Sequence, residues 1–364
     1  MLVLAPSAAQ AQRSVPQNFF GVVFDGYGLT QPLEAQQIHF AQMAYTGVES
    51  ARVTFPWTAL EPRRNEFDFS RTDRTVAAAA RHGVDVLPVI LYTPYWARVN
   101  KRKAYSPPKR TADFTLLMKR LIRRYGSNGS FWRANPSLPK RPIRNWQVWN
   151  EPNNDIERYW DAPRKSAYGW PHGYARLLKA AHKTIHREDR SARTVLGGIT
   201  GISWLELRRL YKAGARNTFD VAALQIYPET VRNEIVALDR MRAELVRARD
   251  KDVRLWVTEV AFPAAKGKTP PIFQQRQQTD AGMASSLSQL YTRLPRGRAR
   301  WGLERVYWYT WASRYGQNRS AFDFSGLVQS KDGLERIPQP AYTAYRNAAI
   351  RAQGCAKNFF GVCQ

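Results

Sequence analysis

Two glutamates lie at the ends of apolar segments, where a buried carboxylate requires a partner or has a function. Glu151 follows the run NWQVWN (145–150) and precedes the rigid Pro152, and Glu259 lies at the end of the run VRLWVTE (253–259). A buried carboxylate is unfavourable by several kcal/mol unless it is paired. A pair of carboxyl groups can cleave a glycosidic bond, one attacking the anomeric carbon and the other protonating the leaving oxygen. The alternative is a pair of solvated strand-end acids.

The elements that must position these acids alternate regularly along the chain. Eight short apolar runs predict strands at 19–24, 48–55, 84–92, 145–150, 194–199, 219–227, 253–259 and 304–311, and segments with helical periodicity follow them. Continuously apolar strands alternating with helices predict an α/β fold, a (β/α)8 TIM barrel forming a single catalytic domain over 17–352. Two doubly wound domains are the alternative. However, no glycine-rich phosphate motif follows the first strand, and no linker divides the chain.

The predicted barrel brings the two acids together. Functional groups of such barrels lie at the carboxyl ends of the strands, and Glu151 and Glu259 occupy these positions on strands four and seven. These strands lie on opposite sides of an eight-stranded ring, so the two carboxylates can face each other across its mouth. Glu61 and Glu229 are rival acids in the loops after strands two and six, but neither ends a strand opposite Glu151.

The motifs around these acids resemble the clan A glycoside hydrolases, most closely family 39 and family 5 cellulase-like glycosidases. The resemblance rests on WQVWNEPN, PYWA and YARLLKAAHKTI, and it runs from about Phe19 to Trp311. It implies that Glu151 is the acid/base and Glu259 the nucleophile. The implied activity is that of a retaining β-glycosidase that hydrolyses a polysaccharide by double displacement.

The resemblance also assigns substrate-binding roles near the acids. Asn150 would contact the sugar 2-hydroxyl, Arg52 would hydrogen-bond the nucleophile and keep it ionised, and Tyr227 would touch the nucleophile. Each has a structural alternative, namely a turn cap, a structural ion pair and a core tyrosine.

Three further positions complete the predicted substrate site. Trp311, at the end of the eighth predicted strand, would be a platform on which a sugar ring stacks, and Trp96 belongs to an aromatic cluster after strand three. Ordinary packing is the alternative for both. Gln225 is a departure, because the related sequences read His-x-Tyr where this chain reads Gln-Ile-Tyr. An amide can bind a hydroxyl but cannot titrate.

Charge is the unusual bulk property of this sequence. A net charge of +27 attracts polyanions, but the basic residues are scattered and no nucleic-acid-binding motif is present, so no nucleic acid is expected as a partner. The loop after the third strand would overhang the active face, and its cations are Arg98, Lys101, Arg102, Lys103, Lys109 and Arg110. They favour an anionic glycan as substrate, with a merely solvated basic loop as the alternative.

The two ends of the chain predict an exported protein. MLVLAPSAAQAQ (1–12) reads as the remnant of a secretion signal, and Cys355 and Cys363 would close a disulfide loop in a tail over 353–364. No apolar stretch is long enough to span a membrane. We therefore expect a secreted, extracellular protein that acts as a monomer.

No cofactor and no metal site are expected from the sequence. None of the five histidines ends a predicted strand, and His182 and His186 lie four residues apart in HKTIH, which lacks the glutamate of a zincin. A solvated helix face explains this pair. Two other functional classes remain as alternatives, a catalytically silent carbohydrate-binding barrel and a basic polyanion-binding protein.

Overall fold

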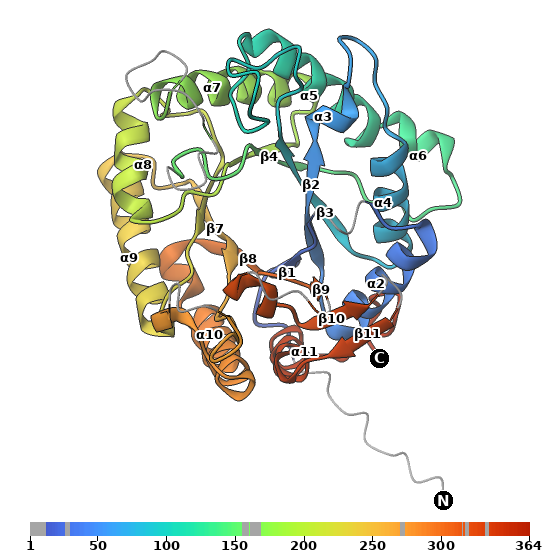
Figure 1. Ribbon diagram of the computed structural model, residues 1–364, viewed down its shortest axis with the longest axis vertical. Helices are drawn as coiled ribbons and strands as arrows, with labels where there is room; N and C mark the ends of the chain where they lie inside the picture. The colour runs from blue at the N-terminus through green and yellow to red at the C-terminus, as the bar shows by residue number, and fades with distance from the viewer. Residues whose placement is uncertain are drawn as a thin grey trace, which may run out of the picture.

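Eight parallel strands close a barrel at the centre of the molecule, in the order β1 to β8 (Figure 1). The computed structural model describes residues 12–25, 30–154, 160, 169–269, 274–314, 316, 320–331 and 335–364, so nearly all of the predicted secretion signal lies outside the described residues. The barrel strands are β1 (Phe20–Val23), β2 (Ser50–Pro56), β3 (Asp85–Leu91), β4 (Asn145–Val148), β5 (Arg193–Leu196), β6 (Val221–Gln225), β7 (Arg254–Val260) and β8 (Leu303–Trp308). Each lies within or overlaps a predicted run, which confirms the (β/α)8 barrel.

A long helix follows each strand and packs on the outside of the barrel (Figure 1). These helices are α2 (Leu33–Thr46), α4 (Ser70–Arg81), α5 (Thr111–Tyr125), α7 (His172–Glu188), α8 (Ser203–Lys212), α9 (Val231–Arg247), α10 (Asp280–Trp301) and α11 (Pro340–Gln353). Short helical turns occupy the connections: α3 (Trp57–Leu60), α6 (Ser130–Ala134), η1 (Gln274–Arg276) and η2 (Ala321–Phe324). Within the described residues, no helix is long and apolar enough to cross a membrane.

The segment between β8 and α11 contains a small sheet that the sequence did not predict. Its strands are β9 (Ala312–Arg314), β10 (Val328–Lys331) and β11 (Glu335–Pro338), with β10 parallel to β9 and antiparallel to β11. Strands of three or four residues are too short to show a clear alternation of polar and apolar side chains. Periodicity therefore does not predict this sheet.

The predicted disulfide between Cys355 and Cys363 is present. The loop that it closes lies against the amino-terminal end of the barrel, where the Lys357 Nζ atom is 3.1 Å from a carboxylate oxygen of the buried Glu49. The backbone carbonyl of Phe359 in the same loop is 2.8 Å from the His82 Nδ1 atom. The tail therefore packs onto the barrel at the end opposite to the two acids.

The barrel interior is tightly packed where β1 meets β8. Gly21 pairs in register with Tyr307, and a Cβ atom at position 21 would lie 2.5 Å from a carbon of the tyrosine ring. The ring is held in place, since its hydroxyl lies 3.0 Å from the Ser50 Oγ atom. Only glycine fits at position 21 without displacing this ring.

Replacement of Gly21 by alanine is expected to lower the free energy of unfolding by about 1–3 kcal/mol, because overpacking forces a shift in a closed core. Urea unfolding followed by circular dichroism measures this change. A second substitution, Tyr307→Leu, should restore part of the loss in the Gly21→Ala background while it destabilises the wild-type protein. Wild-type stability of Gly21→Ala would contradict the packing argument.

Candidate active site

The backbone at the end of β4 turns the Asn150 and Glu151 side chains towards the mouth of the barrel. Trp149 and Glu151 have positive φ angles of 72° and 39°. Such conformations cost about 1–3 kcal/mol in residues other than glycine and gather at functional sites. Tyr174 of α7 supports this turn, because its hydroxyl donates to the Val148 carbonyl at 2.7 Å and accepts from the Gly197 amide at 2.7 Å.

Arg52 of β2 connects three side chains at this mouth. Its Nη1 donates to the Glu259 Oε1 atom at 2.6 Å, its Nη2 to the Asn150 Oδ1 atom at 2.6 Å, and its Nε to the Gln147 Oε1 atom at 2.7 Å. Arg52 is only 1% exposed. The neighbouring carboxylate helps to raise the pKa of the guanidinium above its ordinary value, although burial acts in the opposite direction. The residues predicted on β2, β4 and β7 therefore meet in one hydrogen-bonded group.

Glu259 has a donor for each of its carboxylate oxygens. Arg52 contacts Oε1, and the Tyr227 hydroxyl donates to Oε2. Burial raises the pKa of the Glu259 carboxyl, while Arg52 and the tyrosine hydroxyl lower it and Asp25 raises it further. Both oxygens serve as acceptors, which is the arrangement of an ionised carboxylate with a fixed orientation.

Gln225 lies in this group at the end of β6. Its Nε2 atom donates to the Asn150 Oδ1 atom at 2.9 Å, so that oxygen accepts from both Gln225 and Arg52. Space for the glutamine is provided by Gly198, since a Cβ atom there would lie 2.5 Å from the Gln225 side chain. With its oxygen used twice, Asn150 retains its amide nitrogen as a donor for a bound hydroxyl.

Glu151 lies after the end of β4. Its Oε2 atom accepts a hydrogen bond of 2.6 Å from the Asn154 amide, and the residue is 7% exposed. Glu151 and Glu259 both act electrostatically on the same two tyrosines, Tyr227 and Tyr309, whose pKa values are raised first by burial and then by these carboxylates. The two acids therefore border one shared site.

The prediction of a stacking platform at Trp311 is wrong. Its indole is fully buried and donates to the His39 Nδ1 atom at 3.0 Å. The physical reason is that β8 ends at Trp308, three residues before the predicted end, so the chain has already turned into the core at Trp311. Tyr309 takes the place at the mouth, partly buried and packed edge-on against Tyr227 at a centroid distance of 5.7 Å.

The side chain of Trp96 contacts residues of the segment after β2, and none of its described contacts is with Glu151 or Glu259. Its Nε1 donates to the Glu61 carbonyl at 3.1 Å, and its ring packs edge-on against Trp57. The guanidinium of Arg64 lies over the same ring at 5.0 Å from the centroid. A role for Trp96 in binding sugar stays a prediction.

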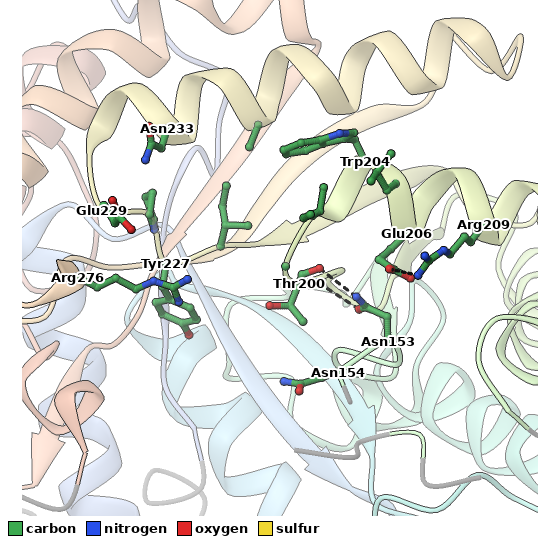
Figure 2. Close-up of a pocket in the computed structure, with 16 residues that line it drawn as sticks. Asn153, Asn154, Thr200, Trp204, Glu206, Arg209, Tyr227, Glu229, Asn233 and Arg276 are labelled. Carbon is green, nitrogen blue, oxygen red and sulfur yellow. Dashed lines mark hydrogen bonds and ion pairs between the residues drawn. The ribbon is translucent and has the colours of Figure 1, made fainter. Parts of the chain in front are cut away.

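A pocket of about 610 Å³ opens beside the two acids. It is bordered by the loops after β4, β5 and β6 and by α8 and α9, and it includes Asn154 and Tyr227, which contact Glu151 and Glu259. Figure 2 shows Tyr227 and Arg276 at one end of this pocket and Glu206 with Arg209 at the other. The pocket combines apolar walls with charged groups of both signs.

Several site residues were missed by the sequence analysis. Gln147 could have been found as a polar residue inside an apolar strand, and Asp25 as an acid directly after the first strand. Asp25 accepts a hydrogen bond of 2.6 Å from the Thr54 hydroxyl. Tyr309 and Asn154 gave no comparable signal, because their importance depends on where β8 ends and on how the loop after β4 folds.

The basic loop after β3 is partly engaged in its own structure. The Lys101 Nζ atom donates to the Tyr95 carbonyl at 2.6 Å, and the Arg98 Nε atom donates to the Thr93 carbonyl at 2.6 Å. A second pocket, of about 280 Å³, includes Lys109, Arg110 and Arg176. The loop therefore supplies cations on the face of the barrel that carries the acids.

Comparisons with known proteins support the same fold. Residues 30–109 match the model of glycoside hydrolase family 42, described as beta-galactosidase, which covers a minor part of the chain. No curated protein sequence matches the chain.

Solved structures similar to the chain include members of families 39 and 5. A family 39 glycoside hydrolase from Bacteroides cellulosilyticus WH2 has a TM-score of 0.65 at 16% identity, over 93% of this chain and 64% of that one. A monomeric beta-xylosidase from Caulobacter crescentus CB15 has a TM-score of 0.66 at 16% identity, over 93% of this chain and 69% of that one. A GH5_18 protein from Bifidobacterium longum subsp. infantis has a TM-score of 0.63 at 15% identity, over 92% of this chain and 79% of that one.

The chain thus spans just under two thirds of the first of these structures. At such identities the likeness establishes the barrel fold. The fold is the one expected from the resemblance to clan A glycoside hydrolases.

One acid in the first turn of α9 is buried without a hydrogen-bond partner among the described residues. Glu234 is fully buried, next to the pocket residue Asn233, and neither of its carboxylate oxygens has a hydrogen-bond partner within the described part of the chain. Burial raises its pKa to about 8. The folded protein therefore holds this group protonated under conditions in which the unfolded chain ionises it.

Glu234 is expected to make the protein less stable as pH rises. Between the ordinary pKa of 4.5 and the folded value of about 8, the unfolded state releases a proton that the folded state retains. Stability should fall by up to about 1.4 kcal/mol per pH unit through this window and level off above it. Urea unfolding of Glu234→Gln should show that this pH dependence of the free energy of unfolding is lost. Glu229→Gln, a substitution at an exposed position, is the control. Parallel profiles for wild type and Glu234→Gln would contradict the interpretation.

Proposed function

We propose that this protein is a retaining β-glycosidase in which Glu259 is the nucleophile and Glu151 the acid/base. The observation that carries the proposal is a pair of buried carboxyl groups at one barrel mouth, one of which has a donor fixed on each oxygen. Arg52 and Tyr227 donate to the two oxygens of Glu259, and Glu151, at the end of β4, acts electrostatically on the same two tyrosines as Glu259. Retaining hydrolysis needs one oriented, ionised carboxylate and one carboxyl that can hold and release a proton.

The first chemical step forms a covalent intermediate. A Glu259 oxygen attacks the anomeric carbon, the bond from that carbon to the leaving oxygen breaks, and the Glu151 proton passes to the leaving oxygen. The Asn150 amide nitrogen donates to the sugar 2-hydroxyl, a bond that strengthens as positive charge develops on the ring. Arg52 positions both Glu259 and Asn150, because it contacts both side chains.

The second step returns the enzyme to its starting state. Glu151, now ionised, takes a proton from a water molecule, and the water oxygen attacks the anomeric carbon. The bond to Glu259 breaks and its carboxylate is restored with the same two donors. Two successive inversions at the anomeric carbon give net retention.

The substrate that we propose is an extended, acidic polysaccharide. Tyr309 offers a partly buried aromatic ring beside Tyr227, on which a sugar can pack. The pocket of about 610 Å³ exceeds what one sugar ring requires. Cations of the loop after β3 would bind the carboxylates of a uronate-bearing chain, as the net charge of +27 also favours.

We further propose that the protein acts outside the cell as a monomer. The secretion-signal remnant in 1–12 supports export, and the disulfide between Cys355 and Cys363 suits an oxidising compartment. One of the solved structures with the same fold is described as a monomeric beta-xylosidase.

Glutamine substitutions at the two acids should have different effects. Both Glu151→Gln and Glu259→Gln should abolish hydrolysis of a natural glycan. With an aryl β-glycoside whose leaving group needs little protonation, Glu151→Gln should still form the glycosyl-enzyme, give a burst of phenolate and be rescued by azide. Stopped-flow absorbance measures the burst. Glu259→Gln should show neither effect, and equal behaviour of the two variants would contradict the roles assigned here.

Salt should weaken the use of an acidic polymer. Apparent affinity should fall between low salt and about 0.15 M, where the screening length is roughly 8 Å. The double variant Arg102→Ser/Lys103→Ser should raise KM on a uronate polymer and reduce its salt dependence, without changing hydrolysis of a small neutral aryl glycoside. The control, Arg240→Ser/Lys251→Ser, removes the same charge from exposed positions in α9 and the turn that follows it.

Reducing-end release over a range of salt concentrations tests this prediction. Equal loss on both substrates would mean that the loop supports the fold. Salt-insensitive hydrolysis of a neutral glucan would contradict the acidic substrate while leaving the glycosidase assignment intact.

A further inference from the structure

A second group of ionisable side chains lies at the end of the barrel opposite to the two acids. His182 and His186 are one turn apart near the end of α7, and Asp220 directly precedes β6. One ligand atom from each of these residues lies within 4.8 Å of the other two. None of the three has a part in the glycosidase chemistry, because that chemistry takes place at the carboxyl ends of the strands.

The distances within this group suit a shared metal ion. The His186 Nε2 atom is 2.9 Å and the His182 Nδ1 atom 3.8 Å from the Asp220 Oδ2 atom. Ligand atoms about 2.1 Å from a tetrahedral ion are separated from one another by about 3.4 Å. The two observed distances lie on either side of this value, so small side-chain rotations would bring the three atoms to one ion.

The group is also held together without an ion. The Thr194 amide of β5 donates to the Asp220 Oδ2 atom at 2.6 Å, and the Thr194 hydroxyl is 2.9 Å from the His182 Nδ1 atom. The two imidazole rings are 4.3 Å apart, centroid to centroid. A site whose ligands are already close loses less conformational freedom when an ion binds.

The site is open to water. The side chains of His182, His186 and Asp220 are 24%, 34% and 29% exposed. An ion can therefore enter, and water can complete its coordination beyond the three protein ligands.

We propose that His182, His186 and Asp220 form a binding site for a divalent transition-metal ion such as Zn²⁺. Two imidazoles and one carboxylate suit Zn²⁺, Ni²⁺ or Cu²⁺, whereas Mg²⁺ and Ca²⁺ prefer an all-oxygen set. The sequence predicts no metal site here, because HKTIH lacks the glutamate of a zincin. The acid comes instead from the start of β6, far away in sequence and adjacent only in the folded barrel.

The bound ion would serve stability rather than catalysis. It would connect the end of α7 to the start of β6, and residues at this end of a barrel generally contribute to folding rather than to chemistry. Its presence should raise the melting temperature in proportion to the logarithm of the ion concentration.

Isothermal titration of the untagged full-length protein with Zn²⁺ tests the proposal. One Zn²⁺ ion should bind per chain. Mg²⁺ at about 1 mM should not compete with Zn²⁺ for the site, because Mg²⁺ prefers oxygen ligands. His186→Gln and Asp220→Asn should each weaken Zn²⁺ binding by roughly tenfold or more, the scale seen when metal-site groups are altered. Asp220→Asn retains an oxygen that can accept from Thr194, so its fold can be checked by circular dichroism.

His172→Gln is the matched control, since His172 is an exposed residue in the first turn of the same helix. It should bind Zn²⁺ as the wild type does. Hydrolysis of an aryl glycoside should be equal in all of these proteins, which separates this proposal from the proposed function. Absence of Zn²⁺ binding, or equal weakening by His172→Gln, would overturn the site and leave a hydrogen bond between His186 and Asp220.

Discussion

The rest of the site depends on the hydrogen bonds and the ion pair that the buried guanidinium of Arg52 makes. A charge that is removed from water is tolerated only when hydrogen bonds and an opposite charge surround it. Arg52 finds them on β4 and β7, in Gln147, Asn150 and Glu259. Strands that are distant in sequence must therefore be in register before this charge can be buried. The same requirement fixes the side chains that would touch the sugar.

Neighbouring backbone features make room for this arrangement. Positive φ angles at Trp149 and Glu151 direct the end of β4 inwards, and Tyr174 ties that end to β5. Gly198 leaves the space that Gln225 occupies. Local backbone strain and a glycine thus occur where the site is assembled. The apolar strands below the site supply the stability that offsets the free-energy cost of this strain.

The sequence was most informative where a single physical rule dominates. Buried parallel strands are mostly apolar, so the eight runs and the helices between them could be predicted, and with them the positions of Glu151 and Glu259. Trp311 shows the limit, because strand ends cannot be read from apolar content when the chain stays apolar beyond the strand. Tyr309 was missed for the same reason. Asp220 was missed because its partners are brought to it only by the closed barrel.

The most direct test of the central claim is the stereochemistry of the first-formed product. Proton NMR can follow hydrolysis of whichever aryl β-glycoside the enzyme accepts and detect the anomeric proton before the sugar mutarotates. The account predicts that the β-anomer appears first and the α-anomer follows by mutarotation, because Glu259 forms a covalent intermediate. Initial appearance of the α-anomer would show a single displacement by water and would contradict the role of Glu259.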